Sequence, residues 1–272
     1  MTRVPPGSGL EGDSPSEQGA ADDPASPGQR PRGAIRPSEE VLRVQSGLPP
    51  HFWVMVRALV FDFDGLILDT EVPVYQAWAE VYQQHGQELS LDFWKTIVGH
   101  GMSSFDAMAE LERRLGRTLD RQAVRTAHRR RQLDLVNALP IAPGVLAWRD
   151  EATLRGAALG LASNSTRAWV VGHLERLGLD GWQCICCAED VGVAKPAADI
   201  YVAVLRCLGV NPGEAIALED SAAGVQSAKA AGLYVVAVPS TLTADHDLSG
   251  ADLVLPSLAD ATFSEVARRA AG

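Results

Sequence analysis

The sequence ALVFDFDGLILDTE, residues 58–71, joins a short apolar run to closely spaced carboxylates. The run 58–61 is typical of a buried central strand. Asp62 and Asp64 follow it, and side chains two residues apart on a strand point to the same face. Two carboxylates that share a buried strand end repel each other and lose hydration, which favours a bound cation or one protonated partner. A solvated Asp-Gly turn is the alternative.

Beyond this stretch, short apolar runs alternate with amphipathic helical stretches. This alternation is typical of βαβ units and of a parallel sheet covered by helices on both faces. The sequence therefore predicts an α/β fold with a doubly wound parallel sheet. Its further strands are predicted at 158–162, 184–187, 215–218, 235–238 and 253–255.

The interval 66–157 breaks the alternation, because it contains only helical signals. A single crossover needs far fewer residues, so we expect about seventy of these residues to form a separate helical insert. Ligands of open parallel sheets bind beyond the carboxyl ends of the strands, where this insert leaves the sheet and can cover the site. The predicted helices are 72–84, 91–98, 103–115, 120–136 and one that begins near Pro143.

These patterns divide the chain into three parts. Residues 1–54 hold nine of the sixteen prolines without hydrophobic periodicity, so we expect a disordered tail and regard Met55 as a candidate start. The α/β core is expected at 55–70 and 142–272, and the helical cap at 71–141.

The charge balance bears on the partners. The 272 residues carry 24 basic and 34 acidic side chains, for a formal charge of −10. The chain lacks the basic stripe that holds a nucleic-acid backbone, and an anionic membrane surface would repel it. We therefore expect neither nucleic acid nor a membrane as a partner, and we expect a monomer.

The four cysteines include a cluster at Cys184, Cys186 and Cys187. They do not make the spaced framework of a secreted disulfide scaffold, so we predict reduced thiols packed in the core. No apolar run approaches the roughly 18 to 20 residues that cross a bilayer, and no signal-peptide segment is apparent. A cytoplasmic location is the expectation.

Polar groups follow two more predicted segments. Ser163 and Asn164 come between the strand 158–162 and a helix, where a hydroxyl and backbone N–H groups can hold an anion. Helix capping is the alternative. Lys195, one of only three lysines, precedes Pro196, which restricts it to extended backbone and gives its ammonium a defined direction.

A second acidic pair, Glu219 and Asp220, follows the strand 215–218. Oxygen ligands without His or Cys favour Mg²⁺ over zinc. In the predicted insert, His100 lies in a turn from which it can reach a substrate, with an ordinary loop as the alternative. The run 129–131 of three arginines is predicted to be a solvated helix face.

Four motifs, DFDGLILDTE, LASNS, KPAADIY and LEDSAAGVQSAKAAG, stand together in an order and spacing that resemble the haloacid dehalogenase-like superfamily. The likeness covers about residues 55–258 and is greatest to phosphatases similar to β-phosphoglucomutase that carry a helical cap. The resemblance implies a nucleophile that forms an aspartyl-phosphate, a general acid/base whose backbone carbonyl also binds metal, groups that hold the phosphoryl, and a Mg²⁺ site. By this resemblance the nucleophile is Asp62 and the general acid/base is Asp64. The groups that hold the phosphoryl are Ser163, Asn164 and Lys195, and the Mg²⁺ site is formed by Asp62, Asp64, Glu219 and Asp220.

The resemblance also bears on the reaction. The first turn of the predicted cap begins with Glu71 and has no His, and the loop 98–102 lacks the Lys and Arg with which the mutase holds a distal phosphate. We therefore expect a Mg²⁺-dependent phosphatase of a small phosphorylated sugar or polyol, with Glu71 and His100 as cap residues for specificity. A phosphosugar mutase is the alternative, and a non-catalytic binding protein on the same fold is the second.

Overall fold

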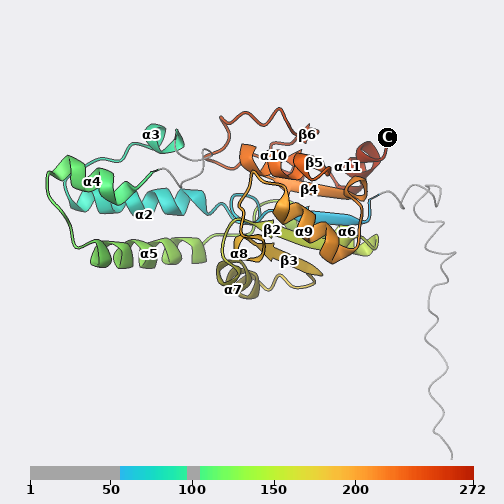
Figure 1. Ribbon diagram of the computed structural model, residues 1–272, viewed down its shortest axis with the longest axis horizontal. Coiled ribbons are helices and arrows are strands. Elements are labelled where there is room, and N and C mark those ends of the chain that lie inside the picture. Colours follow the sequence, from blue (N-terminus) through green and yellow to red (C-terminus); the bar gives the residue numbers. More distant parts are fainter. Residues whose placement is uncertain (1–55, 97–104) are drawn as a thin grey trace, which may run out of the picture. The chain divides into compact units, whose positions relative to one another are not determined.

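The computed structural model describes residues 56–96 and 105–272 (Figure 1). Six strands form one sheet in the order β3-β2-β1-β4-β5-β6, and every neighbouring pair is parallel. The doubly wound parallel sheet predicted from the sequence is confirmed. The strands are β1 Ala58–Phe61, β2 Ala158–Ser163, β3 Cys184–Cys187, β4 Ala215–Glu219, β5 Tyr234–Ala237 and β6 Leu253–Val254.

The central strand β1 lies between β2 and β4, where the strand order reverses. Val60 aligns with Gly160 on one side and with Ala217 on the other. All four residues of β1 are buried, which explains its uninterrupted apolar sequence. In sheets of this kind the crevice at such a reversal, beyond the carboxyl ends of the strands, is the usual ligand site.

Helices cover both faces of the sheet, because successive side chains of a strand point in opposite directions. Leu59 and Phe61 of β1 belong to one apolar cluster, completed by α6, α7 and α11. Ala58 and Val60 belong to the other, completed by α9 and α10. These helices are α6 Val145–Leu154, α7 Arg167–Leu177, α9 Asp199–Leu208, α10 Ala222–Ala230 and α11 Phe263–Ala270, with the short segments α8 Ala188–Val191, η2 Pro212–Glu214 and η3 Leu258–Asp260.

Between β1 and α6 the described chain is helical, as predicted. The helices are α2 Glu71–Gln84, α3 Leu91–Lys95, α4 Ala107–Leu115 and α5 Arg121–Asn137. Figure 1 shows α2 and α5 lying side by side. The helix predicted from residue 103 begins only at Ala107, because the Asp106 side chain caps it by accepting from the N–H groups of Met108 and Ala109. The part of the predicted helix 91–98 beyond residue 96 lies outside the described residues.

The helical insert has an apolar core of its own, which includes Trp78, Tyr82, Trp94 and Met108. Leu242, from the segment after β5, joins this cluster. The chain leaves the sheet and returns to it at one point, where the Ala142 N–H donates to the Ile67 carbonyl at 3.0 Å. The predicted domain boundaries stay predictions, and the predicted tail and Met55 lie outside the described residues. In the two described ranges, no helix combines the length and apolar character needed to cross a membrane.

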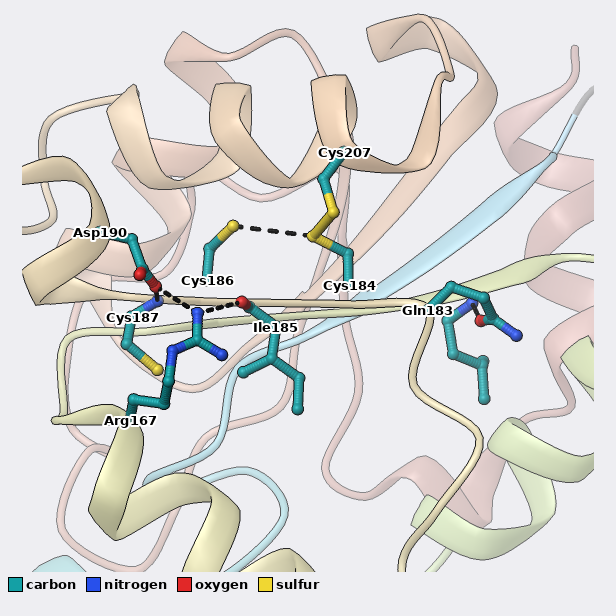
Figure 2. Close-up of a disulfide and its surroundings, with 9 residues drawn as sticks. Arg167, Gln183, Cys184, Ile185, Cys186, Cys187, Asp190 and Cys207 are labelled. Carbon is teal, nitrogen blue, oxygen red and sulfur yellow. Dashed lines mark hydrogen bonds and ion pairs between the residues drawn. A yellow bond between two sulfur atoms is a disulfide. The ribbon is translucent and has the colours of Figure 1, made fainter.

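The cysteines differ from the prediction. Cys184 of β3 forms a disulfide with Cys207 of α9, with Cα atoms 6.1 Å apart (Figure 2). The expectation of four reduced thiols is therefore wrong for this pair, because α9 packs against β3 and brings a distant cysteine beside Cys184. Cys186 and Cys187 are free and buried, as predicted. The expected cytoplasmic location loses the support that four reduced thiols would have given.

Candidate active site

The site begins where β1 ends. The Asp62 N–H donates to the Leu218 carbonyl at 2.9 Å, so Asp62 continues alongside β4. The chain then turns tightly, and the Gly65 N–H donates to the Leu68 carbonyl at 2.7 Å. Gly65 has a φ of 83°, and a Cβ there would lie 2.0 Å from Asp220 Oδ2. Glycine is required at this position, because the turn passes directly against Asp220.

Three carboxylates meet beyond the sheet. Asp62 follows β1, Glu219 ends β4, and Asp220 comes next; all three side chains are buried. Each offers an oxygen within 4.8 Å of the others. The two acidic pairs that the sequence places at strand ends thus contribute three members of one cluster. The Asp64 carboxylate is not part of it, and the predicted metal ligand at Asp64 is its backbone carbonyl, which stays a prediction.

Lys195 lies within this cluster and is itself buried. Its Nζ donates to Asp62 Oδ1 at 2.7 Å, to Glu219 Oε1 at 2.6 Å and to the Ala162 carbonyl at 2.9 Å. The Tyr201 hydroxyl donates to the same Glu219 oxygen at 2.5 Å. The ammonium is therefore fully bound by acceptors from three neighbouring strand ends.

One ammonium does not balance three buried carboxylates. Burial raises the pKa of Asp62 to about 7; Lys195 opposes this rise, and the charge of Glu219 adds to it. Burial, followed by repulsion from Asp62 and Glu219, raises the pKa of Asp220 well above its usual range. Ionisation of all three carboxylates is therefore unfavourable without a further positive charge, which is the electrostatic environment of a cation site.

The residues present fit a hard divalent cation. Glu219 Oε2 is buried and has no hydrogen-bond partner among the described residues. The cluster offers only carboxylate oxygens, which are the ligands that Mg²⁺ prefers. Both the unpartnered oxygen and the donor chemistry are consistent with a magnesium site.

Asp64 points into a separate set of donors. Its Oδ1 accepts from Thr70 Oγ1 at 2.7 Å and from Trp169 Nε1 at 3.0 Å. Its Oδ2 accepts from Ser165 Oγ at 2.6 Å and from Ser163 Oγ at 3.4 Å. The two aspartates of the first motif therefore occupy different environments, one facing Lys195 and the other facing hydroxyl and indole donors.

The remaining predicted phosphate ligands lie beside this arrangement. Ser163 is buried, and its Oγ also accepts from the Ser165 N–H at 3.0 Å. Asn164 Oδ1 accepts from the Lys195 N–H at 2.9 Å, which ties the end of β2 to the backbone that carries the ammonium. The structure thus brings Ser163, Asn164 and Lys195 together, although their roles stay predictions. Thr166, rather than Ser163 or Asn164, is the N-cap of α7.

A cavity of about 500 Å³ opens over these groups and extends to the helical insert. Its floor comes from the strand ends and its opposite wall from α2 and α5. The lining residues include Asp62, Asp64, Ser163, Lys195 and Asp220 from the α/β part of the chain, and Glu71, Val74, Arg129 and Gln132 from the insert.

Glu71, predicted as a cap residue, lines this cavity. Its Oε2 is buried without a hydrogen-bond partner in the described chain. Burial raises the pKa of Glu71 to about 7, and the charges of Asp64 and Asp69 add to this rise. His100, the other predicted cap residue, lies outside the described residues.

Four residues of the site were not singled out for these roles by the sequence. Thr70, Ser165 and Trp169 contact Asp64, and each resembles an ordinary helix-start residue in sequence. Arg129 is exposed, as predicted for the arginine run, and it also lines the cavity. The spacing of Arg129 and Gln132, three residues apart on one helix, is the signal that they share a side.

The fold and the site are those of a known protein family. Residues 59–238, more than half of the chain, match the family model described as haloacid dehalogenase-like hydrolase. The chain therefore belongs to this family, and the resemblance noted in the sequence is confirmed.

Individual relatives are consistent with this family assignment. YhcW of Bacillus subtilis (strain 168), described as a candidate phosphatase, is 37% identical over 207 residues, with 76% of this chain and 94% of that protein covered. Fructose-1-phosphate phosphatase YqaB of Escherichia coli (strain K12) is 34% identical, with 66% and 95% covered. A mutant of CbbY from Rhodobacter sphaeroides, solved with xylulose-(1,5)bisphosphate, has a TM-score of 0.59 and 25% identity, with 76% and 96% covered.

Proposed function

We propose that this protein is a Mg²⁺-dependent phosphatase that hydrolyses a small phosphorylated sugar or polyol through an aspartyl-phosphate on Asp62. The observation that carries this proposal is the buried Asp62 carboxylate, held by Lys195 Nζ at 2.7 Å beside Glu219 and Asp220. Phosphoryl transfer needs a positioned nucleophile and charge stabilisation more than it needs covalent chemistry from the protein.

The reaction has two halves. Asp62 attacks phosphorus; its new O–P bond forms as the ester O–P bond breaks, and Asp64 gives the leaving alkoxide a proton. Water then attacks the phosphorus of the acyl-phosphate while Asp64 accepts a proton, which releases phosphate and restores Asp62. Ser163 and Lys195 hold the phosphoryl oxygens, and Asn164 supports the Lys195 backbone.

Asp62, Glu219 and Asp220, with the backbone carbonyl of Asp64, would hold Mg²⁺. When bound, the ion neutralises charge on the phosphoryl oxygens and on the carboxylates around it. Without such an ion, the approach of an anionic ester to three carboxylates is opposed by every group in the cluster except Lys195.

The substrate class rests on the cavity and on the relatives. A cavity of about 500 Å³ has room for a small sugar or polyol beyond the phosphoryl group. YqaB is named as a fructose-1-phosphate phosphatase, and the CbbY mutant was solved with a sugar bisphosphate. Both observations support phosphorylated carbohydrates as the first compounds to test.

The test is a panel of sugar and polyol phosphates assayed for free phosphate, with Mg²⁺ and with a chelator. Asp62→Asn should lose activity by several orders of magnitude, whereas Asp180→Asn, at an exposed carboxylate, should keep it. Phosphate release that persists unchanged in Asp62→Asn would contradict the proposal and favour a non-catalytic binding protein. Labelled phosphate that moves to another position of the sugar, without appearing free, would identify a mutase.

A further inference from the structure

The indole of Trp169 lies against the carboxylate that the proposed reaction uses twice. Its Nε1–H donates to Asp64 Oδ1 at 3.0 Å, from the first turn of α7. The same side chain is half-buried and lines the cavity. Trp169 thus combines a hydrogen bond to the acid/base residue with an apolar surface toward the substrate.

The indole is held in place from behind. Its ring meets the His173 ring edge to face at a centroid distance of 4.3 Å. The His173 ring in turn stacks on Phe63 at 6.2 Å. Phe63 stands between Asp62 and Asp64 in sequence and is fully buried. A continuous line of rings therefore connects α7 to the turn that carries both aspartates, and it restricts how the indole can rotate.

The indole also differs in kind from the other donors to Asp64. Its N–H can only donate, so the oxygen it contacts, Oδ1, has to remain an acceptor. The hydroxyls of Ser163 and Ser165 beside Oδ2 can either donate or accept. Oδ2 is therefore the oxygen of Asp64 on which a proton can reside without loss of a hydrogen bond.

We infer that Trp169 is a positioning residue for the general acid/base: it fixes the Asp64 carboxylate so that Oδ2, rather than Oδ1, exchanges the proton with the leaving group. The inference rests on the proposed function, because it assigns Trp169 a part in that reaction. Removal of the indole N–H should matter most where the leaving group depends on protonation. An alkoxide depends on it strongly, and p-nitrophenolate hardly at all.

The experiment compares Trp169→Phe with the wild type on two esters. One is the sugar phosphate with the highest wild-type kcat/KM in the panel above, and the other is p-nitrophenyl phosphate. Trp169→Phe keeps an aromatic wall and removes the N–H, so kcat/KM for the sugar phosphate should fall about tenfold, as expected for a lost hydrogen bond to a charged group. For p-nitrophenyl phosphate it should fall by less than about twofold, and KM for both should stay nearly constant.

Trp182→Phe is the matched control. The Trp182 Nε1–H donates to the Leu179 carbonyl at 3.0 Å, and this indole is not among the cavity-lining residues. The control should leave the ratio of the two kcat/KM values unchanged. A second test places Trp169→Phe in an Asp64→Ala background and follows the residual cleavage of the sugar phosphate in single turnovers, which report only the first half of the reaction. If Trp169 acts through Asp64, the added substitution should have no further effect there.

An equal loss on both esters, or an undiminished loss in the Asp64→Ala background, would overturn the inference and leave Trp169 a structural residue. If Trp169→Phe fails to fold in a thermal melt, Trp169→Tyr provides the same comparison with the donor displaced. Activity that survives Asp62→Asn would instead overturn the proposed function. An inactive Asp62→Asn with an unaltered Trp169→Phe would overturn only the inference about Trp169.

Discussion

Lys195 Nζ and Asp62 Oδ1 lie 2.7 Å apart, although 133 residues separate them in the sequence. Both side chains are buried, and Glu219 completes the ion pair from the other side. A buried charge that loses its partner is left uncompensated, which costs more than the pair contributes. The lysine therefore bears on stability as well as on the proposed reaction.

Lys195→Met should lower the free energy of unfolding in metal-free buffer by about 3–5 kcal/mol, because Asp62 and Glu219 lose their only buried cation in the cluster. Urea unfolding measures this effect. Lys229→Met is the control: its ion pair with Asp252 is solvent-exposed on the lysine side and should contribute about 1 kcal/mol or less. Equal losses in the two variants would contradict the buried ion pair.

Gly65→Ala should abolish catalysis and destabilise the fold. Its Cβ would lie 2.0 Å from Asp220 Oδ2, so the turn or the carboxylate has to move. Gly86→Ala has a similar positive φ, yet nothing lies within 4 Å of its Cβ. It should cost only the backbone strain of about 1–2 kcal/mol and keep activity. Thermal melts and phosphatase assays distinguish the two, and an active Gly65→Ala would contradict the close approach.

The Glu71 carboxyl predicts a pH dependence of stability. Its pKa is raised from 4.5 unfolded to about 7 folded, chiefly by burial. Between these pH values the folded protein binds more protons than the unfolded chain does. The stability that protonated Glu71 contributes is therefore fully present below pH 4.5 and is lost as the pH rises through about 7. Glu71→Gln should flatten the profile of unfolding free energy between pH 5 and pH 8, measured in urea. Glu88→Gln, at an exposed position of the same insert, should leave the slope unchanged.

Arg129 predicts an effect on substrate binding. It lines the cavity and forms no ion pair with any residue in the described parts of the chain, whereas Lys195 is already paired twice. Arg129→Ala should raise KM for sugar phosphates by about tenfold with little change in kcat, the magnitude of a lost charge-assisted contact. The effect should be larger for a bisphosphate. Arg130→Ala, whose side chain is not among those lining the cavity, should change neither constant.

The disulfide predicts a redox-dependent stability. Closing a loop of 23 residues restricts the unfolded chain by roughly 3 kcal/mol in the chain-entropy treatment. Cys207→Ser should lower the melting temperature by about 6–12 °C. Dithiothreitol should lower the wild type to the same value and leave Cys207→Ser unaffected. A wild type insensitive to the reductant, with Cys184 and Cys207 both reactive toward a thiol reagent, would contradict the bond.

Much of the fold is predictable from local sequence. The strand Ala58–Phe61 is apolar at every position because helices cover both of its faces, and the run itself records that environment. The cluster of Asp62, Glu219 and Asp220 is also predictable, since the ends of parallel strands meet at one edge of the sheet. Periodicity and strand ends are properties of short segments, so short segments reveal them.

Contacts between elements are not predictable in the same way. Trp169 is one of several apolar residues in an unremarkable helix until α7 is placed against the turn that carries Asp64. Cys207 lies in a helix whose apolar side packs on the sheet, and only that packing brings it to Cys184. Arg129 belongs to an arginine run, of which the fold turns one member toward the cavity. Each depends on the direction of a side chain across an interface.

The hydrogen bond from Ala142 N–H to the Ile67 carbonyl closes the excursion of the chain between β1 and β2. The pairing of Ala58 with Ala158 thus begins from two chain ends that are already held together. The excursion supplies Glu71 and Arg129 to the cavity, whereas Asp62, Lys195 and Asp220 come from outside it, so changes within the excursion can alter the cavity wall without altering the carboxylate cluster. Helices of a relative grafted between Ile67 and Ala142 should therefore leave the carboxylate cluster in place.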